Sequence, residues 1–391
     1  MVGLKERVIT DLHKRRQNIL EGKINSIPSP FIRFSEDFIG IEQATYYGVT
    51  ATTKGAKSQF VSKVFIYHAL MYAYENQDKL KLKIFYFPLE ETPERILQRF
   101  MSYILFKKFN IRISPRDLRS SRNDHPVSEE VLQYLEDEEI VKILTFFEEN
   151  VIFSTETNPT GIYKFCMKYA QDNGTTYTNK IQIVDDLGNS KEIETFDHYE
   201  PNDPTEYKLI IIDTINLIDT EKGLTLKQSM DKLSEYLAKK LRNRYGFSPV
   251  VIQQQAFDQE GIENIKLNKL RPSVAGLGDS KYIGRDANIV LGLFSPARFD
   301  LKEYLGYDIT KFNDNIRFLE VCVNRDGSLG GIIALYFDGA VCEFAELPKP
   351  DNLSELTQVY KYMNLVRSKP IGTKLFFIRT LNRIKQKWQT Q

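Results

Sequence analysis

Short apolar runs of strand length, separated by stretches of helical pattern, constrain this sequence more than any other feature. The runs are continuous and rich in β-branched residues, as in strands that are buried on both faces. They are Tyr46–Thr50, Lys83–Pro88, Val151–Ser154, Leu209–Ile212, Val250–Ile252, Ile289–Leu293, Phe318–Val323 and Ile332–Phe337. A helical stretch from Gln59 to about Asn76 follows the first run. The alternation predicts an α/β domain with a mostly parallel sheet over residues 28–347.

The overall composition excludes several classes of protein. The chain has 391 residues with 53 Lys and Arg against 52 Asp and Glu, so nucleic acid would have to be bound by local patches. Cys166, Cys322 and Cys342 are far apart, which argues against a disulfide scaffold or a zinc ribbon. Neither a run of about 18 apolar residues nor a signal peptide is present, so we expect a cytoplasmic protein without a membrane span.

Two segments flank the predicted domain. Residues 1–27 form an amphipathic helix that ends at the Ile27-Pro28 pair, and it either packs on its own domain or acts as an arm on a neighbouring subunit. Residues 348–391 form a helical tail, and positions 352–391 carry eight Lys and Arg against the single acid Glu355. The tail is either a packed helix with a solvated basic face or an arm for nucleic acid or a partner protein.

An insertion interrupts the predicted domain at about residues 173–204. Two short alternating strands flank a Gly-Asn turn there, which is the pattern of a β-hairpin. We expect this hairpin to lie on the surface of the α/β core.

A phosphate-binding loop is predicted where the first strand meets its helix. The segment matches G-x-x-x-x-G-K-[ST] with alanine at both glycine positions, and its residues are Ala51, Thr52, Thr53, Lys54, Gly55, Ala56, Lys57 and Ser58. Backbone N–H groups and the lysine of such a loop bind phosphates, and the hydroxyl of Ser58 would hold Mg²⁺. The match is degenerate by itself, so an ordinary loop stays open at this point.

Polar residues follow three other predicted strands. Glu90 and Asp213 come directly after strands, where a carboxylate can activate water or support Mg²⁺, although each could instead cap a helix. Gln253, Gln254 and Gln255 end a third strand, and a glutamine there could sense the γ-phosphate. Ligands of parallel α/β sheets bind at this edge, which makes these residues candidates for one site.

The order of these motifs resembles the RecA-like ATPase domain of DnaB-type hexameric replicative helicases over about residues 25–347. The segments that carry the likeness are the P-loop, Phe87–Ile96, Ile212–Leu217, Pro249–Ala256, Arg271–Val290 and Val323–Gly330. The resemblance implies a P-loop NTPase that uses ATP and Mg²⁺, forms a homo-oligomer such as a hexamer, and acts on single-stranded DNA. It also implies a primase or loader as partner, and the cytoplasm of a bacterium or phage-infected host as setting.

The same resemblance implies roles for individual residues. Glu90 corresponds to the catalytic base, Asp213 to the Mg²⁺-supporting aspartate, Gln255 to the sensor glutamine in a gapless match, and Arg325 to an arginine finger supplied to the neighbouring subunit. Loops that would line the DNA channel contain basic residues, namely Lys222, Lys266, Lys269 and Arg271, which could equally serve surface solubility.

Two departures from the family pattern keep other functions open. Ala56 replaces a glycine and, in a left-handed conformation, would cost about 1–2 kcal/mol. Val323 stands where the family has a second lysine that acts in trans. The alternatives are a RecA-like ATPase without unwinding, such as a recombination mediator or helicase loader, and a degenerate structural or cargo protein.

Overall fold

A nine-stranded sheet forms the centre of the protein in the computed structural model, which describes residues 4–184, 190–256, 261, 263–264, 270–327 and 330–368. Its parallel strands, in sheet order, are β10 (Ile289–Phe294), β3 (Tyr47–Ala51), β9 (Ser248–Gln254), β8 (Glu206–Asp213), β4 (Lys81–Pro88) and β5 (Val151–Phe153). The predicted α/β class with a mostly parallel sheet is confirmed.

One edge of the sheet is antiparallel. Beside β10 lie β13 (Ile316–Asn324), β14 (Ile332–Asp338) and β15 (Glu343–Glu346). The apolar runs of β13 and β14 were expected to belong to parallel strands. Only residues 325–331 join β13 to β14 and only residues 339–342 join β14 to β15, so these three strands are antiparallel neighbours without a crossover helix.

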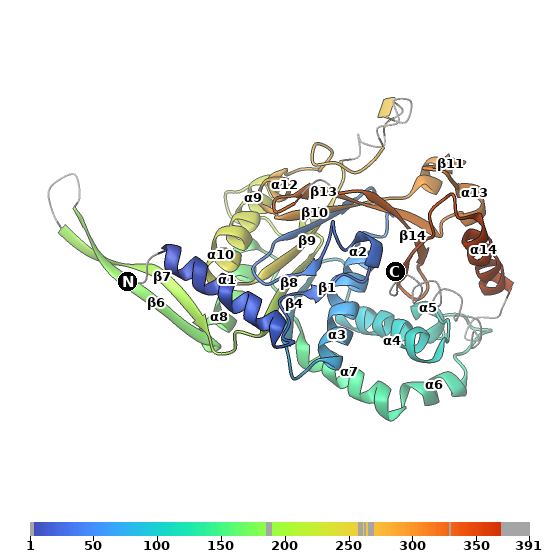
Figure 1. Ribbon diagram of the computed structural model, residues 1–391, viewed down its shortest axis with the longest axis horizontal. Coiled ribbons are helices and arrows are strands. Elements are labelled where there is room, and N and C mark those ends of the chain that lie inside the picture. The colour runs from blue at the N-terminus through green and yellow to red at the C-terminus, as the bar shows by residue number, and fades with distance from the viewer. Residues whose placement is uncertain are drawn as a thin grey trace.

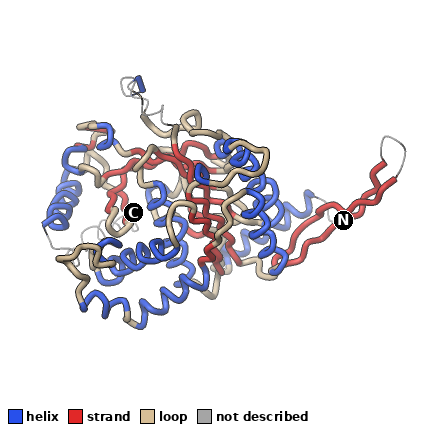
Figure 2. Tube along the Cα trace, turned by 180° about the vertical axis from the view of Figure 1, so that it is seen from behind, coloured by secondary structure: helices blue, strands red, loops and turns tan. Residues whose placement is uncertain are grey.

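Helices cover both faces of the sheet because both faces are apolar (Figure 2). Leu209 and Ile211 of β8 belong to one buried cluster, while Ile210 and Ile212 belong to another. On the first face lie α2 (Lys57–Val61), η2 (Ser62–His68), α3 (Ala69–Glu75), α4 (Pro93–Phe109) and α7 (Glu138–Asn150). On the second face lie α8 (Pro159–Asp172), α9 (Leu226–Glu235), η4 (Tyr236–Arg242), α10 (Asn243–Tyr245) and α12 (Tyr282–Asp286).

Smaller elements complete the fold. Two helices follow α4, namely α5 (Pro115–Leu118) and α6 (Glu129–Leu135). Around the antiparallel edge lie β11 (Glu303–Tyr304), β12 (Tyr307–Asp308), α13 (Ile309–Phe312) and α14 (Leu353–Ser368). Short elements elsewhere are β1 (Ile27–Pro28), β2 (Gly40–Ile41), η1 (Ile32–Phe34), η3 (Ile215–Leu217) and η6 (Pro296–Phe299).

The insertion is a separate two-stranded ribbon that projects from the body (Figure 1). It consists of β6 (Gly174–Val184) and β7 (Ser190–Pro201), so its strands are longer than the pattern indicated, and the Gly-Asn turn lies outside the described residues. Tyr199 fixes its base, because its single hydroxyl proton is shared between the carbonyl oxygens of Ala170 (3.0 Å) and Asn173 (3.1 Å).

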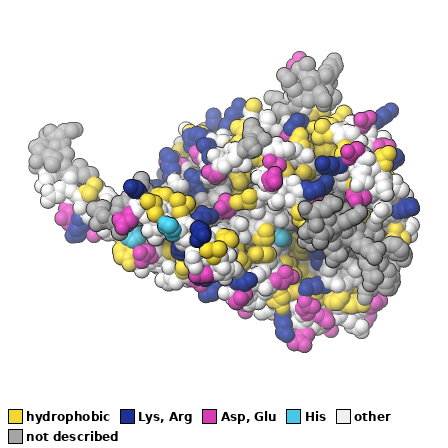
Figure 3. All heavy atoms as spheres, viewed as in Figure 1, with side chains coloured by type: hydrophobic (Ala, Val, Ile, Leu, Met, Phe, Trp, Pro, Cys, Tyr) yellow, Lys and Arg dark blue, Asp and Glu magenta, His cyan; other side chains and the backbone are white. Residues whose placement is uncertain are grey.

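The first helix, α1 (Leu4–Leu20), contacts its own domain through a polar face. Arg15 pairs with Glu42 at 3.0 Å, and Asn25 donates a hydrogen bond to the backbone oxygen of Arg15. Apolar residues of α1 are exposed, with 62% of both Leu12 and Ile19 accessible, and hydrophobic side chains are visible along it in Figure 3. Its role on a neighbouring subunit stays a prediction.

The beginning of the C-terminal tail is a packed helix. Leu356, Val359 and Met363 of α14 are buried against the antiparallel edge of the sheet. The rest of the predicted helical tail, with Phe377, Leu381, Ile384 and Trp388 at helical spacing, lies outside the described residues. Within the described part, the structure contains no helix that is both long and apolar enough to span a membrane.

Candidate nucleotide-binding site

A cavity of about 330 Å³ lies at the carboxyl ends of the parallel strands. Its lining residues come from the P-loop, from the segments after β4 and β8, from α4 and from β9, and they are Thr53, Lys54, Ala56, Lys57, Ser58, Gln59, Glu90, Glu91, Arg99, Asp213, Thr214, Ile252 and Gln254. The sequence placed Glu90 and Asp213 after separate strands, and the sheet brings both to the P-loop. This is the edge at which α/β sheets bind ligands.

The P-loop conformation explains its unusual sequence. Ala51 is still part of β3, so alanine carries no conformational penalty there. Ala56 is left-handed (φ 71°), which is the conformation in which alanine is unfavourable. At Gly55 a Cβ atom would come within 2.6 Å of the Cβ of Ala51, so this glycine is required by close approach. Glycine is therefore present at position 55, where a Cβ atom would clash, while Ala56 adopts an unfavourable backbone conformation at the next position.

Helix α2 begins at Lys57, directly after this loop. The ammonium of Lys57 donates a hydrogen bond to the backbone oxygen of Thr52 at 3.2 Å, and thus lies across the loop that a phosphate would occupy. The buried hydroxyl of Thr52 has no hydrogen-bond partner among the described residues. A lysine, a helix N-terminus and an unpaired hydroxyl together favour an anionic ligand.

Asp213 and Ser58 form the candidate Mg²⁺ site. The hydroxyl of Ser58 donates to one carboxylate oxygen of Asp213 (2.8 Å), and the hydroxyl of Tyr86 donates to the other (3.0 Å). Burial raises the pKa of Asp213 to about 6, helped by the charge of Glu90, while the two hydrogen bonds and Arg99 act to lower it.

These oxygen ligands fit Mg²⁺. The ion prefers one or two carboxylates together with phosphate oxygens rather than an all-protein cage. In the described ranges, no group of three His, Cys, Asp or Glu side chains is arranged to hold a metal alone. Asp213 and Ser58 would therefore hold the ion jointly with the bound nucleotide.

Glu90 and Glu91 follow β4 and have different surroundings. Glu90 is exposed at the cavity, as a group that must meet water needs to be. Glu91 pairs with Arg99, whose side chain is only 13% exposed. We did not single out Arg99 from the sequence. The segment from Phe87 resembles the motif FxSLEMPxEQxxxR of the DnaB-type family, and the final arginine of that motif falls on Arg99 when its first glutamate is aligned with Glu90.

Gln254, not Gln255, lines the cavity. The side chain of Gln254 donates a hydrogen bond to the hydroxyl of Thr53 in the P-loop. Gln255 is buried, where it donates to the hydroxyl of Thr50 (2.8 Å) and the backbone oxygen of Ser273 (3.1 Å). Successive side chains of a strand point to opposite faces of the sheet. Neighbouring glutamines at the end of β9 therefore have different surroundings, and only Gln254 faces the cavity.

Arg325 lies far from this cavity within its own chain. It follows β13, whose last residue Asn324 pairs with Ile289 at the start of β10, whereas the P-loop follows the end of β3. The guanidinium donates to the backbone oxygens of Ala287 (2.8 Å) and Arg285 at the end of α12. The fold therefore keeps Arg325, which is exposed, away from the P-loop of its own chain.

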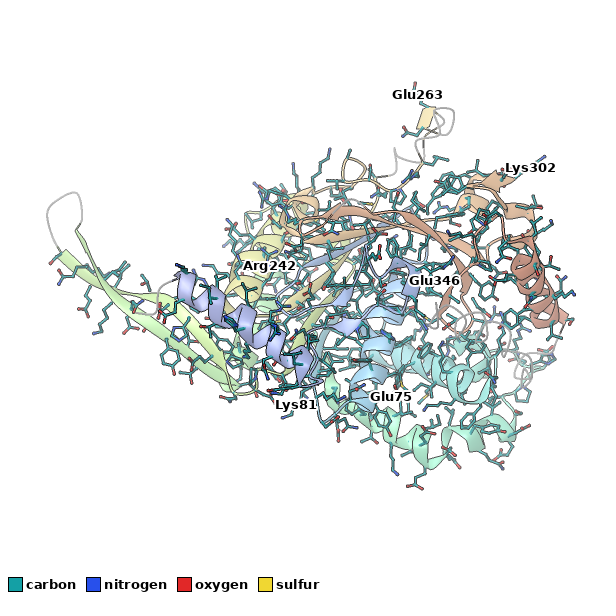
Figure 4. The ribbon with its side chains drawn as sticks, in the orientation of Figure 1. Glu75, Lys81, Arg242, Glu263, Lys302 and Glu346 are labelled. Carbon is teal, nitrogen blue, oxygen red and sulfur yellow. The ribbon has the colours of Figure 1, made fainter. Side chains whose placement is uncertain are left out.

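The predicted DNA-binding residues do not form one described group. Lys222 is exposed in the turn before α9, while Arg271 pairs with Glu320. Lys266 and Lys269 lie outside the described residues. Glu263, from the same part of the sequence, lies away from the body of the protein at the top of Figure 4.

Comparisons with known proteins place the fold. No family model and no curated protein matches the sequence. Among solved structures, the ATPase domain of G40P has a TM-score of 0.61 at 14% identity, with 89% of this chain and 100% of that chain covered. A DnaB-like replicative helicase, described with its interactions with primase, has a TM-score of 0.58 at 15% identity, with 88% of this chain and 67% of that chain covered. The chain thus has the RecA-like fold of DnaB-type ATPase domains.

Proposed function

We propose that this chain is an ATP-hydrolysing DNA helicase of the DnaB type, which forms a ring and moves along single-stranded DNA in replication. One observation carries the proposal: Lys57 and Ser58 of the P-loop share a cavity with Asp213 and Glu90. A lysine for phosphates, two oxygen ligands for Mg²⁺ and an exposed carboxylate are the parts that nucleotide hydrolysis needs.

Each of these residues has a distinct task in the proposed reaction. Lys57 and the backbone of residues 51–58 bind the phosphates of ATP, and Ser58 and Asp213 hold Mg²⁺, which neutralises phosphate charge when bound. Glu90 accepts a proton from the attacking water. Gln254 is the candidate for contact with the γ-phosphate, because it reaches the P-loop and Gln255 does not.

The proposed active state is a homo-oligomer, a hexamer by analogy with the family. Arg325 would leave the end of α12 and complete the neighbouring subunit's site. The exposed apolar residues of α1 support an arm that packs on an adjacent copy, since such residues are stabilised by burial.

The proposed partners are single-stranded DNA and a primase or loader protein. Lys222 and Arg271, with Lys266 and Lys269 of the same loops, would bind DNA phosphates, which makes binding strongly dependent on salt. Arg271 would have to exchange Glu320 for a phosphate. The structural neighbour described with primase suggests that class of partner.

Steady-state ATP hydrolysis with and without single-stranded DNA tests the proposal. Glu90→Gln should reduce turnover by about 10²–10⁴-fold because the general base is lost, while nucleotide binding persists. Glu94→Gln, which changes an exposed carboxylate nearby, is the matched control. Unchanged turnover in Glu90→Gln would contradict the assignment.

A forked-DNA assay then separates the remaining functions. Turnover without strand separation would favour a RecA-like ATPase that does not unwind. A wild-type chain that binds no ATP would favour a structural or cargo protein on a helicase fold.

A further inference from the structure

Arg99 is a largely buried cation at the cavity, and one of its nitrogens has no hydrogen-bond partner among the described residues. It lies in the second turn of α4, on the side of the cavity formed by Glu90 and Glu91. One terminal nitrogen donates to Glu91, and the other, Nη1, is buried with no hydrogen-bond partner among the described residues. A guanidinium has five N–H donors and loses stability when one is buried and unpaired.

The position of Arg99 relates it to the reacting end of a nucleotide. Arg99, Glu90 and Asp213 all line the same cavity. Lys57 lines the cavity as well, and its ammonium donates to the backbone oxygen of Thr52 in the P-loop. The phosphate furthest from the nucleoside would therefore lie between Lys57 and Arg99, beside Glu90.

We propose that Arg99 binds the terminal phosphate of a nucleoside triphosphate in its own subunit, through Nη1, while Glu91 fixes the guanidinium. The inference rests on the proposed function and extends it, because it assigns to this chain a second phosphate-binding cation that acts in cis. Arg99 thereby distinguishes a triphosphate from a diphosphate before any neighbouring subunit contributes.

The consequence is selective loss of triphosphate affinity. A hydrogen bond between charged groups contributes enough that its removal should weaken binding about tenfold to a hundredfold. Because a diphosphate lacks the phosphate in question, Arg99→Gln should leave its affinity within about twofold of the wild type. A purely structural arginine would instead affect both nucleotides alike.

The experiment measures the binding of fluorescent ADP and of a fluorescent, non-hydrolysable ATP analogue to the full chain with Mg²⁺. Arg99→Gln is compared with the wild type and with Arg95→Gln, which changes an exposed arginine one turn earlier on α4. Arg99→Lys provides a second variant if the glutamine does not fold, and it should lose part of the discrimination because lysine cannot bridge Glu91 and a phosphate at once.

The expected result is a lower affinity for the ATP analogue alone in both Arg99 variants and unchanged affinities in Arg95→Gln. If a folded Arg99 variant loses affinity for both nucleotides equally, or for neither, the proposed role of Arg99 is overturned and the proposed function stays intact. A folded wild-type chain that binds neither nucleotide overturns the proposed function and this inference together.

Discussion

At the scale of single residues, the two alanines of the P-loop are not equivalent. Ala51 is extended and buried in β3, whereas Ala56 is left-handed. We expect Ala56→Gly to raise the free energy of unfolding by about 0.5–1 kcal/mol, because relief of backbone strain exceeds the added entropy of the unfolded chain.

Urea unfolding checks this expectation. The matched control is Ala51→Gly, which should destabilise the protein because glycine relieves no strain in a strand. A lower stability of Ala56→Gly than of the wild type would contradict the backbone argument.

The raised pKa of Asp213 predicts that the stability of the protein depends on pH. Burial, the largest cause, raises its pKa from 3.8 to about 6, so the folded state binds this proton more tightly than the unfolded state. The contribution of Asp213 to the free energy of unfolding should therefore fall as the pH rises from about 4 to about 6, by at most about 3 kcal/mol, and stay constant above.

The measurement compares the wild type with Asp213→Asn, in the absence of nucleotide, across this pH range. The free energy of unfolding of Asp213→Asn minus that of the wild type should increase from pH 4 to pH 6 and stay constant at higher pH. A wild type that gains stability over the variant across that window would show that the carboxylate is not held in an unfavourable, buried site.

At the residue scale, the sequence alone does not determine which polar side chains face the cavity. Each glutamine in Gln253–Gln255 could be the sensor, since nothing in three identical side chains tells which one faces the P-loop. The register of β9 against β3 decides it, because Ala51 pairs with Gln254. The family motif marks the position of Arg99, but its contact with Glu91 inside the cavity depends on how α4 packs.

At the scale of elements, the parallel strands could be predicted because each is a continuous apolar run. Leu209–Ile212 is buried on both faces, and this pattern is visible in the sequence alone. The antiparallel edge could not be predicted, because β13 and β14 have the same kind of sequence as the parallel strands. The ribbon was recognised, but its length depends on residues with weak alternation.

At this scale we predict that helix α1 is needed for assembly of the protein but not for its fold. Because its apolar residues are exposed while its polar contacts to the domain are few and partly exposed, removal of residues 1–24 should leave the fold intact and weaken assembly. Light scattering with Mg-ATP should report a smaller mean mass, and circular dichroism an unchanged core.

A point variant refines this test. Leu12→Asp with Ile19→Asp keeps the helix but makes the exposed face polar, and it should reduce the mass in the same direction. Full-size particles from both proteins would refute the role of α1 as an arm.

At the scale of the whole molecule, the proposed ring would give each subunit half of two sites. The P-loop cavity lies at one edge of the sheet and Arg325 at the opposite edge, so a head-to-tail arrangement of copies would bring the two together. Arg325→Ala should lower hydrolysis by about 10³–10⁵-fold, as expected for an arginine finger, without weakening ADP binding. Steady-state turnover and equilibrium binding measure the two effects separately.

A mixture of Glu90→Gln and Arg325→Ala subunits tests the shared site most directly. Each variant alone should be nearly inactive, but in an equal mixture about a quarter of the interfaces join an intact Glu90 to an intact Arg325 across a heterologous contact. We predict that mixing restores ATP hydrolysis well above the level of either variant alone. Turnover in the mixture no higher than the average of the two separate variants would contradict a site completed by the neighbouring copy.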